Sequence, residues 1–260
     1  MKPTNIILDL LRTYRHRGTS ARNIMSTAEM FGVTQNLTRV TLSRLVNRGL
    51  VENVSRGHYR LATVSDPVSN FIEEWQRGEA RCRKWTTDTY LVAHISAPSE
   101  KDLWILAATG FLPIRPALWA RPDNLVRSRE LLTEWLLELG LSHQVLLMHH
   151  AQLDAKEQKN LISAYQIDKL KAGYRAMNSR LAKSAMTLTS RSKPEAMSES
   201  FHLGGEAIQL LAKDPYLPKP LIRTDERIAL WKAMKEYDRL GRGIWADSPT
   251  MMPAALAGST

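Results

Sequence analysis

The sequence predicts an α+β protein in which helical and strand-rich segments follow one another along the chain. Apolar residues recur at helical spacing near the N-terminus, runs rich in β-branched and aromatic residues occupy the middle, and strand patterns disappear after Ala151. A chain of 260 residues suits two or three small domains. We place the boundaries at 1–65, 66–84, 85–152 and 153–250.

The first 65 residues predict three helices followed by a hairpin. Thr4–Tyr14 and Ser20–Phe31 carry apolar residues at helical spacing, and a third helix begins at Thr34, whose hydroxyl can cap the first turn. Gly49 suits the left-handed residue that ends such a helix. The strand-like runs Leu50–Val54 and His58–Thr63 then flank a turn. This order is typical of a winged helix-turn-helix, and the alternative is an ordinary helix and hairpin of another α+β domain.

The third helix and its hairpin carry the candidate DNA contacts. We expect Leu37, Thr41 and Leu45 to face the core, which leaves polar residues on the opposite side. Such helices read bases from their N-terminal turns, whereas hairpin cations contact phosphates. Arg39 in an internal ion pair and Arg56 as a solvated turn residue are the alternatives. The candidates are Thr34, Gln35, Asn36, Arg39, Ser43, Arg44, Arg56, His58 and Arg60.

The positive charge is concentrated in the same region. Residues 1–65 contain ten Lys/Arg and three acids, which gives +7 of the total net charge of +10. Residues 66–150 contain nine Lys/Arg and eleven acids (−2), and the remainder contains seventeen and twelve (+5). Clustered cations raise affinity for nucleic acid by releasing counterions from phosphates. The charge distribution therefore favours DNA binding by the first region.

The middle of the chain predicts strands that alternate with helices. We expect strands over Thr89–Ile95, Pro116–Arg121 and Gln144–His149, with helices over Lys101–Thr109 and Leu125–Leu139 between them. This split βαβ order favours a ferredoxin-like α+β domain over 85–152, joined to the first region by a linker helix.

The remaining chain predicts an all-helical C-terminal domain. Helices are expected over Glu157–Met186, Ser198–Lys213 and Thr224–Leu240. Between Asp168 and Glu195 there are seven Lys/Arg and no acid. That basic stretch is compatible with a ligand site, a solvated helical face or a second DNA contact.

Enzyme chemistry is poorly supported by the sequence. Cys82, the single cysteine, has basic neighbours that could lower its pKa, but no convincing partners, and it excludes an internal disulfide. Adjacent His149 and His150 lack the spacing of a helical metal site. We therefore predict no catalytic residues, metal or cofactor. No run approaches the roughly 18 apolar residues of a membrane span and no signal peptide is evident, so a cytoplasmic protein is expected.

Several separated motifs follow one another along the chain, namely IILDLLRTY, FGVTQNLTRVTLSRLVNRGLVE with GHYRL, GFLPIRPALWARPDNL, and LAKDPYLPKPL. In their sequences and in their order they resemble the PaaX-type transcriptional repressors of phenylacetic acid catabolism. The resemblance implies a DNA-binding winged helix, a ferredoxin-like middle, a helical C-terminal domain and a homodimer. It also implies control by an acyl-coenzyme A thioester, which is phenylacetyl-CoA in the best-known members, or by a related aromatic acid.

A thioester of coenzyme A needs cations at one end of its pocket and apolar walls at the other. Arg115, Trp119 and Arg121 offer that mixture around the segment PALWAR, and Tyr174 with Arg175 offers it in the basic stretch. Trp119 as a core residue is the structural alternative.

Together these patterns predict a dimeric, ligand-responsive bacterial repressor that binds a palindromic operator. The alternatives are a small-molecule-binding enzyme and a metal-dependent nuclease built on the ferredoxin-like domain.

Overall fold

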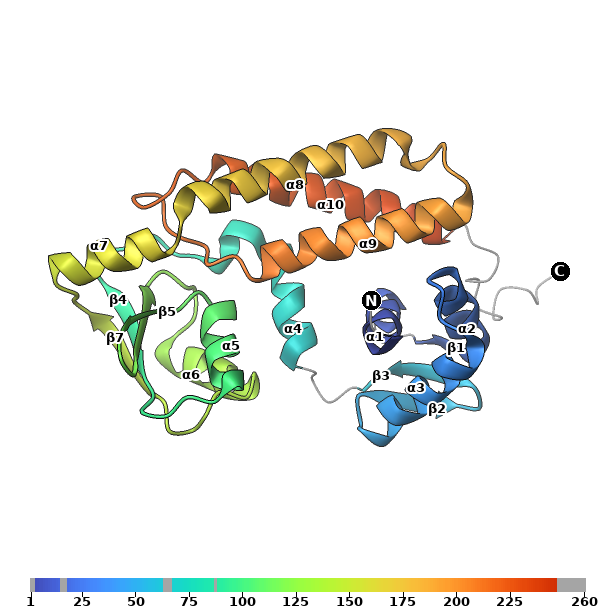
Figure 1. The fold of residues 1–260 in the computed structure, drawn as a ribbon, viewed down its shortest axis with the longest axis horizontal. Coiled ribbons are helices and arrows are strands. Elements are labelled where there is room, and N and C mark those ends of the chain that lie inside the picture. Colours follow the sequence, from blue (N-terminus) through green and yellow to red (C-terminus); the bar gives the residue numbers. More distant parts are fainter. Residues whose placement is uncertain (1–2, 15–17, 63–66, 87, 247–260) are drawn as a thin grey trace. The chain divides into compact units, whose positions relative to one another are not determined.

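The computed structural model describes residues 3–14, 18–62, 67–86 and 88–246 of a mixed α+β protein. It contains two small antiparallel sheets and a helical C-terminal region (Figure 1). The chain divides into two compact units. The first comprises Met1–Asn70, Met186–His202 and Asp238–Thr260, and the second comprises Phe71–Ala185 and Leu203–Tyr237.

The first unit contains three helices and a three-stranded sheet. In chain order they are α1 (Pro3–Tyr14), β1 (Thr19–Ser20), α2 (Ala21–Met30), α3 (Gln35–Asn47), β2 (Val51–Ser55) and β3 (His58–Leu61). The sheet order is β1-β3-β2 and both pairings are antiparallel. The three helices and the hairpin expected from the sequence are confirmed. The short strand β1 was not expected, because its two residues are too few to produce an alternating pattern.

Local signals explain where α3 begins and ends. The Thr34 hydroxyl accepts a hydrogen bond from the backbone N–H of Leu37 at 3.3 Å, which confirms the expected cap. Gly49 follows the helix with φ 67°, in the left-handed region that glycine adopts at little cost. The sequence therefore fixes both ends of α3 through residues adjacent to it.

The core of the first unit is made by all three of its helices together with parts of two later ones. Ile7, Leu10, Leu11, Ile24, Leu42, Leu45 and Val51 pack with Met197 and Trp245. Met197 belongs to α9 (Lys193–Ala212) and Trp245 to α10 (Asp225–Ala246). Within α3 the buried positions are Thr38, Thr41, Leu42 and Leu45. The expectation that Leu37 packs inward is wrong, since its side chain is 43% exposed.

The second unit contains a four-stranded sheet with two helices between its strands. Its elements are β4 (Tyr90–His94), α5 (Glu100–Ala108), β5 (Leu112–Arg115), β6 (Leu118–Pro122), α6 (Arg129–Glu138) and β7 (Leu146–Ala151). The sheet order is β5-β6-β4-β7 with every neighbouring pair antiparallel. Helices α5 and α6 lie on one side of this sheet (Figure 1). Helix α4 (Pro67–Glu73) and the 3-10 helix η2 (Glu74–Arg81) precede the sheet, where one linker helix was expected.

The edge strand β5 was absent from the strands expected from the sequence. Among the described strands its one partner is β6, and it contains Pro113, which lacks a backbone N–H. Proline is tolerated in a strand at a sheet edge, but it weakens the pattern by which a strand is recognised. The sequence therefore predicted three strands where the structure has four.

The single helix expected over Glu157–Met186 is wrong, because the chain turns between two helices there. Helix α7 (Ala155–Ala164) has Tyr165 as its C-cap residue, and α8 (Ile167–Leu188) follows. Gln166 has φ 49°, which interrupts helical geometry. The buried hydroxyl of Tyr165 donates a hydrogen bond to the Gly110 carbonyl at 2.8 Å, and this contact holds the turn against the strand side of the unit.

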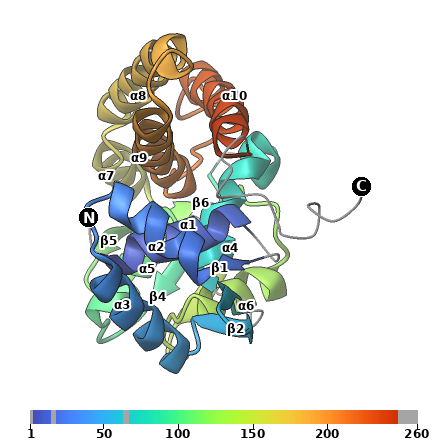
Figure 2. The same cartoon turned by 90° about the vertical axis from the view of Figure 1, so that its right-hand side faces the viewer.

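Within the second unit, α8 up to Ala185 lies beside the later part of α9 and the first part of α10 (Figures 1 and 2). Ser184 and Tyr237 share a buried hydrogen bond of 2.8 Å between α8 and α10, and Arg180 donates to Glu206 of α9 at 2.7 Å. No helix in the described part of the chain is long and apolar enough to cross a membrane.

Candidate functional site

One face of α3 presents polar, basic and apolar side chains to solvent. A surface that reads base edges combines hydrogen-bonding groups with apolar contacts, and this mixture is compatible with such a surface. Leu37 and Val40 are 43% and 41% exposed, so apolar groups lie among the polar ones. The exposed residues of the sequence-predicted set on this helix are Gln35, Asn36, Arg39, Ser43 and Arg44.

The cations of this face have no carboxylate partner among the described residues. Within the residues that the structure describes, no ion pair involves Arg39, Arg44 or Arg56, and Arg56 is exposed at the turn between β2 and β3. A pairing of Arg39 with an acid of its own domain was the alternative to DNA contact, and it is not observed in the described chain. Unpaired cations cost little in water and remain available to phosphates or base edges.

Three other predicted DNA contacts are partly engaged within the unit. The Arg60 guanidinium pairs across the hairpin with Glu52 at 2.9 Å, which neutralises its charge. The Thr34 hydroxyl caps α3, and Thr34 itself remains exposed to solvent. His58 lies half-buried in β3, opposite Ser20 of β1. Of the two predicted arginines of the hairpin, Arg56 is thus the one without an ion pair in the described chain.

The Thr34 cap is expected to contribute measurably to the free energy of unfolding. Replacing Thr34 with alanine should lower the free energy of unfolding by about 1 kcal/mol, within the range of roughly 0.5–2 kcal/mol for lost caps, because the Leu37 N–H loses its acceptor. Urea denaturation of the full chain measures the change. Thr34→Ser keeps the hydroxyl and serves as the control. Equal losses for the serine and alanine variants would show that the hydroxyl is not what stabilises the helix.

A second site lies in the second unit, around the segment Asp214–Leu217. Buried side chains bind the backbone carbonyls of this segment and of the residues before it. Arg121 donates to the Pro215 carbonyl at 3.1 Å, and Asn124 donates to the Tyr216 carbonyl at 2.7 Å. Arg227 donates to the Leu217 carbonyl at 3.2 Å. Three carbonyl groups of the main chain therefore help to hold the segment in place.

Two guanidinium groups lie over the ring of Tyr216. The Arg81 guanidinium lies 4.3 Å from the ring centroid and the Arg227 guanidinium lies 4.7 Å from it. Tyr216 has φ 48°, a left-handed conformation that is costly for a bulky residue and persists only where the surroundings enforce it. Burial raises the pKa of the Tyr216 hydroxyl to about 12, although nearby Arg81 acts in the opposite direction.

Asp214 and Arg227 form the charged centre of this cluster. The Asp214 Oδ1 atom accepts a hydrogen bond from the backbone N–H of Tyr216 at 2.6 Å and lies 3.6 Å from Arg227. Arg227 also donates to both carboxylate oxygens of Glu79, at 2.8 and 3.0 Å. Burial raises the pKa of the Asp214 carboxyl, and the charge of Arg227 opposes that shift. Burial alone would lower the pKa of Arg227, but Asp214 and Glu79 raise it.

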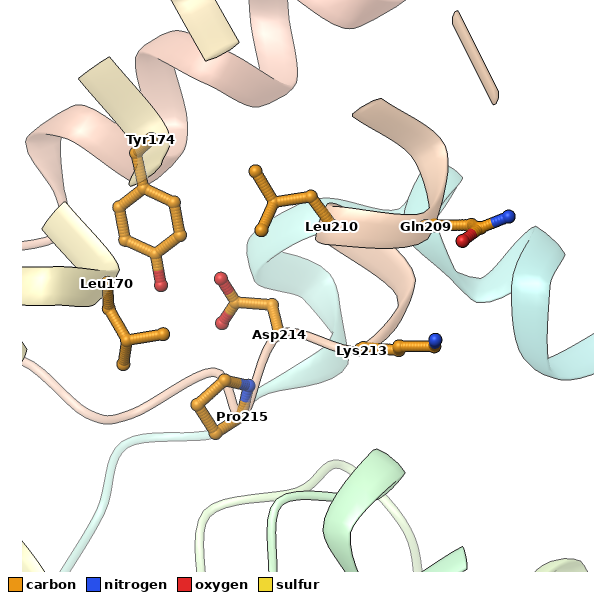
Figure 3. A pocket seen from close by; sticks show the side chains of 7 residues that line it. All are labelled: Leu170, Tyr174, Gln209, Leu210, Lys213, Asp214 and Pro215. Carbon is orange, nitrogen blue, oxygen red and sulfur yellow. The ribbon is translucent and has the colours of Figure 1, made fainter. Parts of the chain in front are cut away.

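A pocket opens beside this cluster, between α8 and α9. Its volume is about 260 Å³. The Tyr174 ring and the Asp214 carboxylate point toward each other at the pocket (Figure 3). Burial raises the pKa of the Tyr174 hydroxyl, and the facing Asp214 carboxylate raises it further. The two side chains therefore interact with each other, although the hydroxyl and the Asp214 Oδ2 atom do not form a hydrogen bond of good geometry. The lining residues are Leu170, Tyr174, Gln209, Leu210, Lys213, Asp214 and Pro215.

Of the five predicted effector-binding residues, only Tyr174 lines this pocket. Arg115 lies on β5 and pairs with Glu157 and Asp154 at the start of α7. Trp119 is buried in β6, as its core alternative implied.

The other two predicted residues are already engaged. Arg121 is buried, with its donors bound to the Thr109 and Pro215 carbonyls and to Asn124. Arg175 is exposed on α8 and bonds Glu226 at 3.2 Å.

Asp214 and its neighbours were missed as site residues. They lie within the motif LAKDPYLPKPL, which carried the family resemblance without any assigned role, and that motif was the available signal. Cys82 is partly buried near the same segment, and its Sγ lies 3.7 Å from the Tyr216 carbonyl. Burial raises the pKa of its thiol despite Arg121, which is opposite to the shift that its basic neighbours in the sequence suggested.

Comparisons with known proteins show a shared fold only. No protein-family model matches the sequence, and no curated protein matches it. A solved structure, the uncharacterized protein Rv0674 from Mycobacterium tuberculosis, is similar to this chain with 17% sequence identity and a TM-score of 0.56. The match covers 93% of this chain and 97% of the other. The arrangement of elements is thus shared over nearly the full length of both chains.

Proposed function

We propose that the chain is a cytoplasmic, ligand-responsive transcriptional repressor of the PaaX type that binds operator DNA through α3 and the β2–β3 hairpin. The observation that carries the proposal is the exposed face of α3, on which Arg39 and Arg44 have no carboxylate partner in the described chain. Base-reading helices need such free hydrogen-bond donors. The net charge of +7 on residues 1–65 adds a long-range attraction for phosphates.

The elements of the first unit support a winged helix-turn-helix. Three helices and a three-stranded antiparallel sheet follow one another in the order expected for that motif, with β1 completing the sheet beside β3. A winged helix places its third helix in the major groove and its hairpin near the backbone. Gln35, Asn36, Arg39 and Ser43 would then contact base edges, and Arg56 a phosphate.

The second unit supports a ferredoxin-like domain. Its elements follow the order β-α-β-β-α-β, and the sheet order β5-β6-β4-β7 places the first and third strands in the centre. In this proposal the domain and the helices after it form the ligand-binding and dimerisation part. A homodimer presents two reading helices about one DNA turn apart, which requires a palindromic operator. The effector is an acyl-CoA thioester or a related aromatic acid.

The experiment that tests this proposal is selection of duplex DNA from a random pool by the full chain, followed by gel-shift titration with magnesium present. We expect enrichment of one palindromic sequence, a shift at nanomolar protein, and DNA that remains uncut. If no sequence is enriched, the repressor function is contradicted, and the alternative of a small-molecule-binding enzyme is favoured. Cleavage of the duplex would favour the metal-dependent nuclease.

Arg56 at the hairpin turn is expected to contribute to the salt dependence of DNA affinity. Replacing Arg56 with glutamine should reduce the slope of log affinity against log salt by about 0.9, because one phosphate contact is lost. Arg60→Gln is the matched control, since its guanidinium already pairs with Glu52 at 2.9 Å and should change the slope much less. Binding titrations at four salt concentrations measure both slopes. A constant slope with lost specificity would instead show that Arg56 reads bases.

A further inference from the structure

We infer that the middle of the exposed α3 face reads A·T base pairs, with Val40 against a thymine methyl group and Asn36 on the edge of an adenine. This base preference rests on the proposed DNA binding, and it goes beyond that function by naming the bases that α3 selects. Val40 was not among the DNA contacts expected from the sequence.

Three short side chains form one line along the exposed face of α3. Asn36, Val40 and Ser43 are all exposed, and they are separated by four and three residues. Residues at these spacings are neighbours on the same face of a helix. The buried residues of α3 lie on the opposite side, where Leu42 and Leu45 enter the core. This line is therefore the part of α3 that points away from the protein and into a groove.

Val40 occupies the centre of this line, where its chemistry suits one base. It is 41% exposed and lies outside the core, and its side chain forms no hydrogen bonds. A β-branched residue is also a weaker helix former than alanine, so neither packing nor helix formation favours valine there. The apolar group that base edges present in the major groove is the methyl group of thymine. A valine that faces the groove therefore matches thymine.

Asn36 lies one turn before Val40 and can both donate and accept hydrogen bonds. It is exposed, and no hydrogen bond of its side chain is found among the described residues. Asparagine matches adenine, because its amide can accept from N6 and donate to N7. Four residues of helix rise about 6 Å and base pairs are about 3.4 Å apart, so the adenine and thymine contacts should lie within about two base-pair steps.

The charged residues of α3 lie beside this line. Arg39 is on one side of it and Arg44 on the other, and both are exposed. Their long side chains can reach phosphates or outer base edges, which leaves the middle of the groove to the short side chains. Guanine is usually read by arginine or lysine, and cytosine by glutamate or aspartate. None of the three residues of the line is of these types, so the line favours A·T over G·C pairs.

The test measures the affinity of the full chain for the operator duplex selected from the random pool, by fluorescence anisotropy. Each thymine of one half-site is replaced in turn with deoxyuridine, which removes only the methyl group. We expect one position at which Kd rises roughly three- to fivefold, as for one methyl group lost from an apolar contact. Replacing each adenine in turn with 7-deazaadenine, which lacks the N7 acceptor, should raise Kd roughly fivefold at a position within about two steps of that thymine.

Variants assign the two effects to their residues. Val40→Ser should bind the thymine and deoxyuridine duplexes with nearly equal affinity, and Asn36→Ala should do the same for the adenine and 7-deazaadenine duplexes. Both residues are exposed, so the melting curves should stay close to that of the wild type. Val126→Ser is the matched control, because Val126 is a 46% exposed valine of the second unit, and its variant should keep the full response to deoxyuridine.

The outcomes separate this base preference from the proposed function. An enriched operator without a methyl-sensitive thymine, or a sensitivity that persists in Val40→Ser, overturns the role of Val40 and leaves the proposed function unaffected. Sensitivity to 7-deazaadenine that persists in Asn36→Ala likewise overturns the role of Asn36. A selected half-site of G·C pairs alone overturns both roles. If no sequence is enriched, the proposed function and the base preference are both contradicted.

Discussion

Replacing Arg227 with methionine is expected to lower the free energy of unfolding by about 3–5 kcal/mol. The guanidinium is only 2% exposed, and it contacts the carboxylates of Asp214 and Glu79 as well as the Leu217 carbonyl. Methionine fills similar volume but donates nothing. The buried Asp214 charge then loses its main cation, and this uncompensated charge accounts for most of the predicted loss.

Urea denaturation followed by circular dichroism measures this effect. Arg223→Met is the matched control, because Arg223 is 84% exposed and pairs with Asp225 only at the surface. Exposed ion pairs contribute roughly 0–1 kcal/mol, so the control should remain near the wild type. Combining Arg227→Met with Asp214→Asn should recover part of the loss, since the unpaired charge is removed. Similar stabilities for the Arg227 and Arg223 variants would contradict the role given to the buried cluster.

Replacing Arg39 with alanine should weaken operator binding by about 1–3 kcal/mol, which is roughly a five- to 150-fold rise in Kd. Arg39 is exposed in the middle of α3, and no described carboxylate pairs with it. Removing its side chain therefore breaks no ion pair among the described residues. The melting curve should therefore stay unchanged. Fluorescence anisotropy with the selected duplex measures the affinity.

Two further variants identify what Arg39 contacts. Arg39→Lys keeps the charge but loses the planar fork that binds guanine at two points, so it should recover little affinity if a base is read. Full recovery would assign Arg39 to a phosphate. Arg223→Ala removes an equal charge from the second unit and should leave affinity unchanged. An Arg39→Ala variant with wild-type affinity would exclude Arg39 from the interface.

The elements that the sequence predicted well are those set by neighbouring residues. Thr34 caps α3 through a residue three positions away, and Gly49 ends it through its own backbone conformation. The elements that it predicted poorly depend on distant contacts. Strand β5 exists because β6 pairs with it, and the turn at Gln166 is held by a hydrogen bond from Tyr165 to Gly110, 55 residues away. Local patterns contain no information about such partners.

The two candidate sites, the α3 face and the pocket, also differ in how far the sequence could predict them. An exposed helical face can be predicted from periodicity, and most of the predicted α3 residues are exposed. The pocket could not be predicted, because Tyr174 and Asp214 meet only when α8 and the segment after α9 pack together. A distant contact likewise sets the surroundings of Arg121, which the sequence predicted as an effector contact. Its guanidinium donates to the Pro215 carbonyl, and Pro215 lies 94 residues away.

The most direct measurement is the ratio of two affinities of the full chain at one salt concentration. One duplex carries the selected operator, and the other carries the same base pairs in shuffled order. Reading by α3 predicts that the operator binds at least 10³-fold more tightly, as is typical of specific DNA-binding proteins. A ratio near one would mean that the basic first unit attracts phosphates without reading bases, and this would contradict the repressor function.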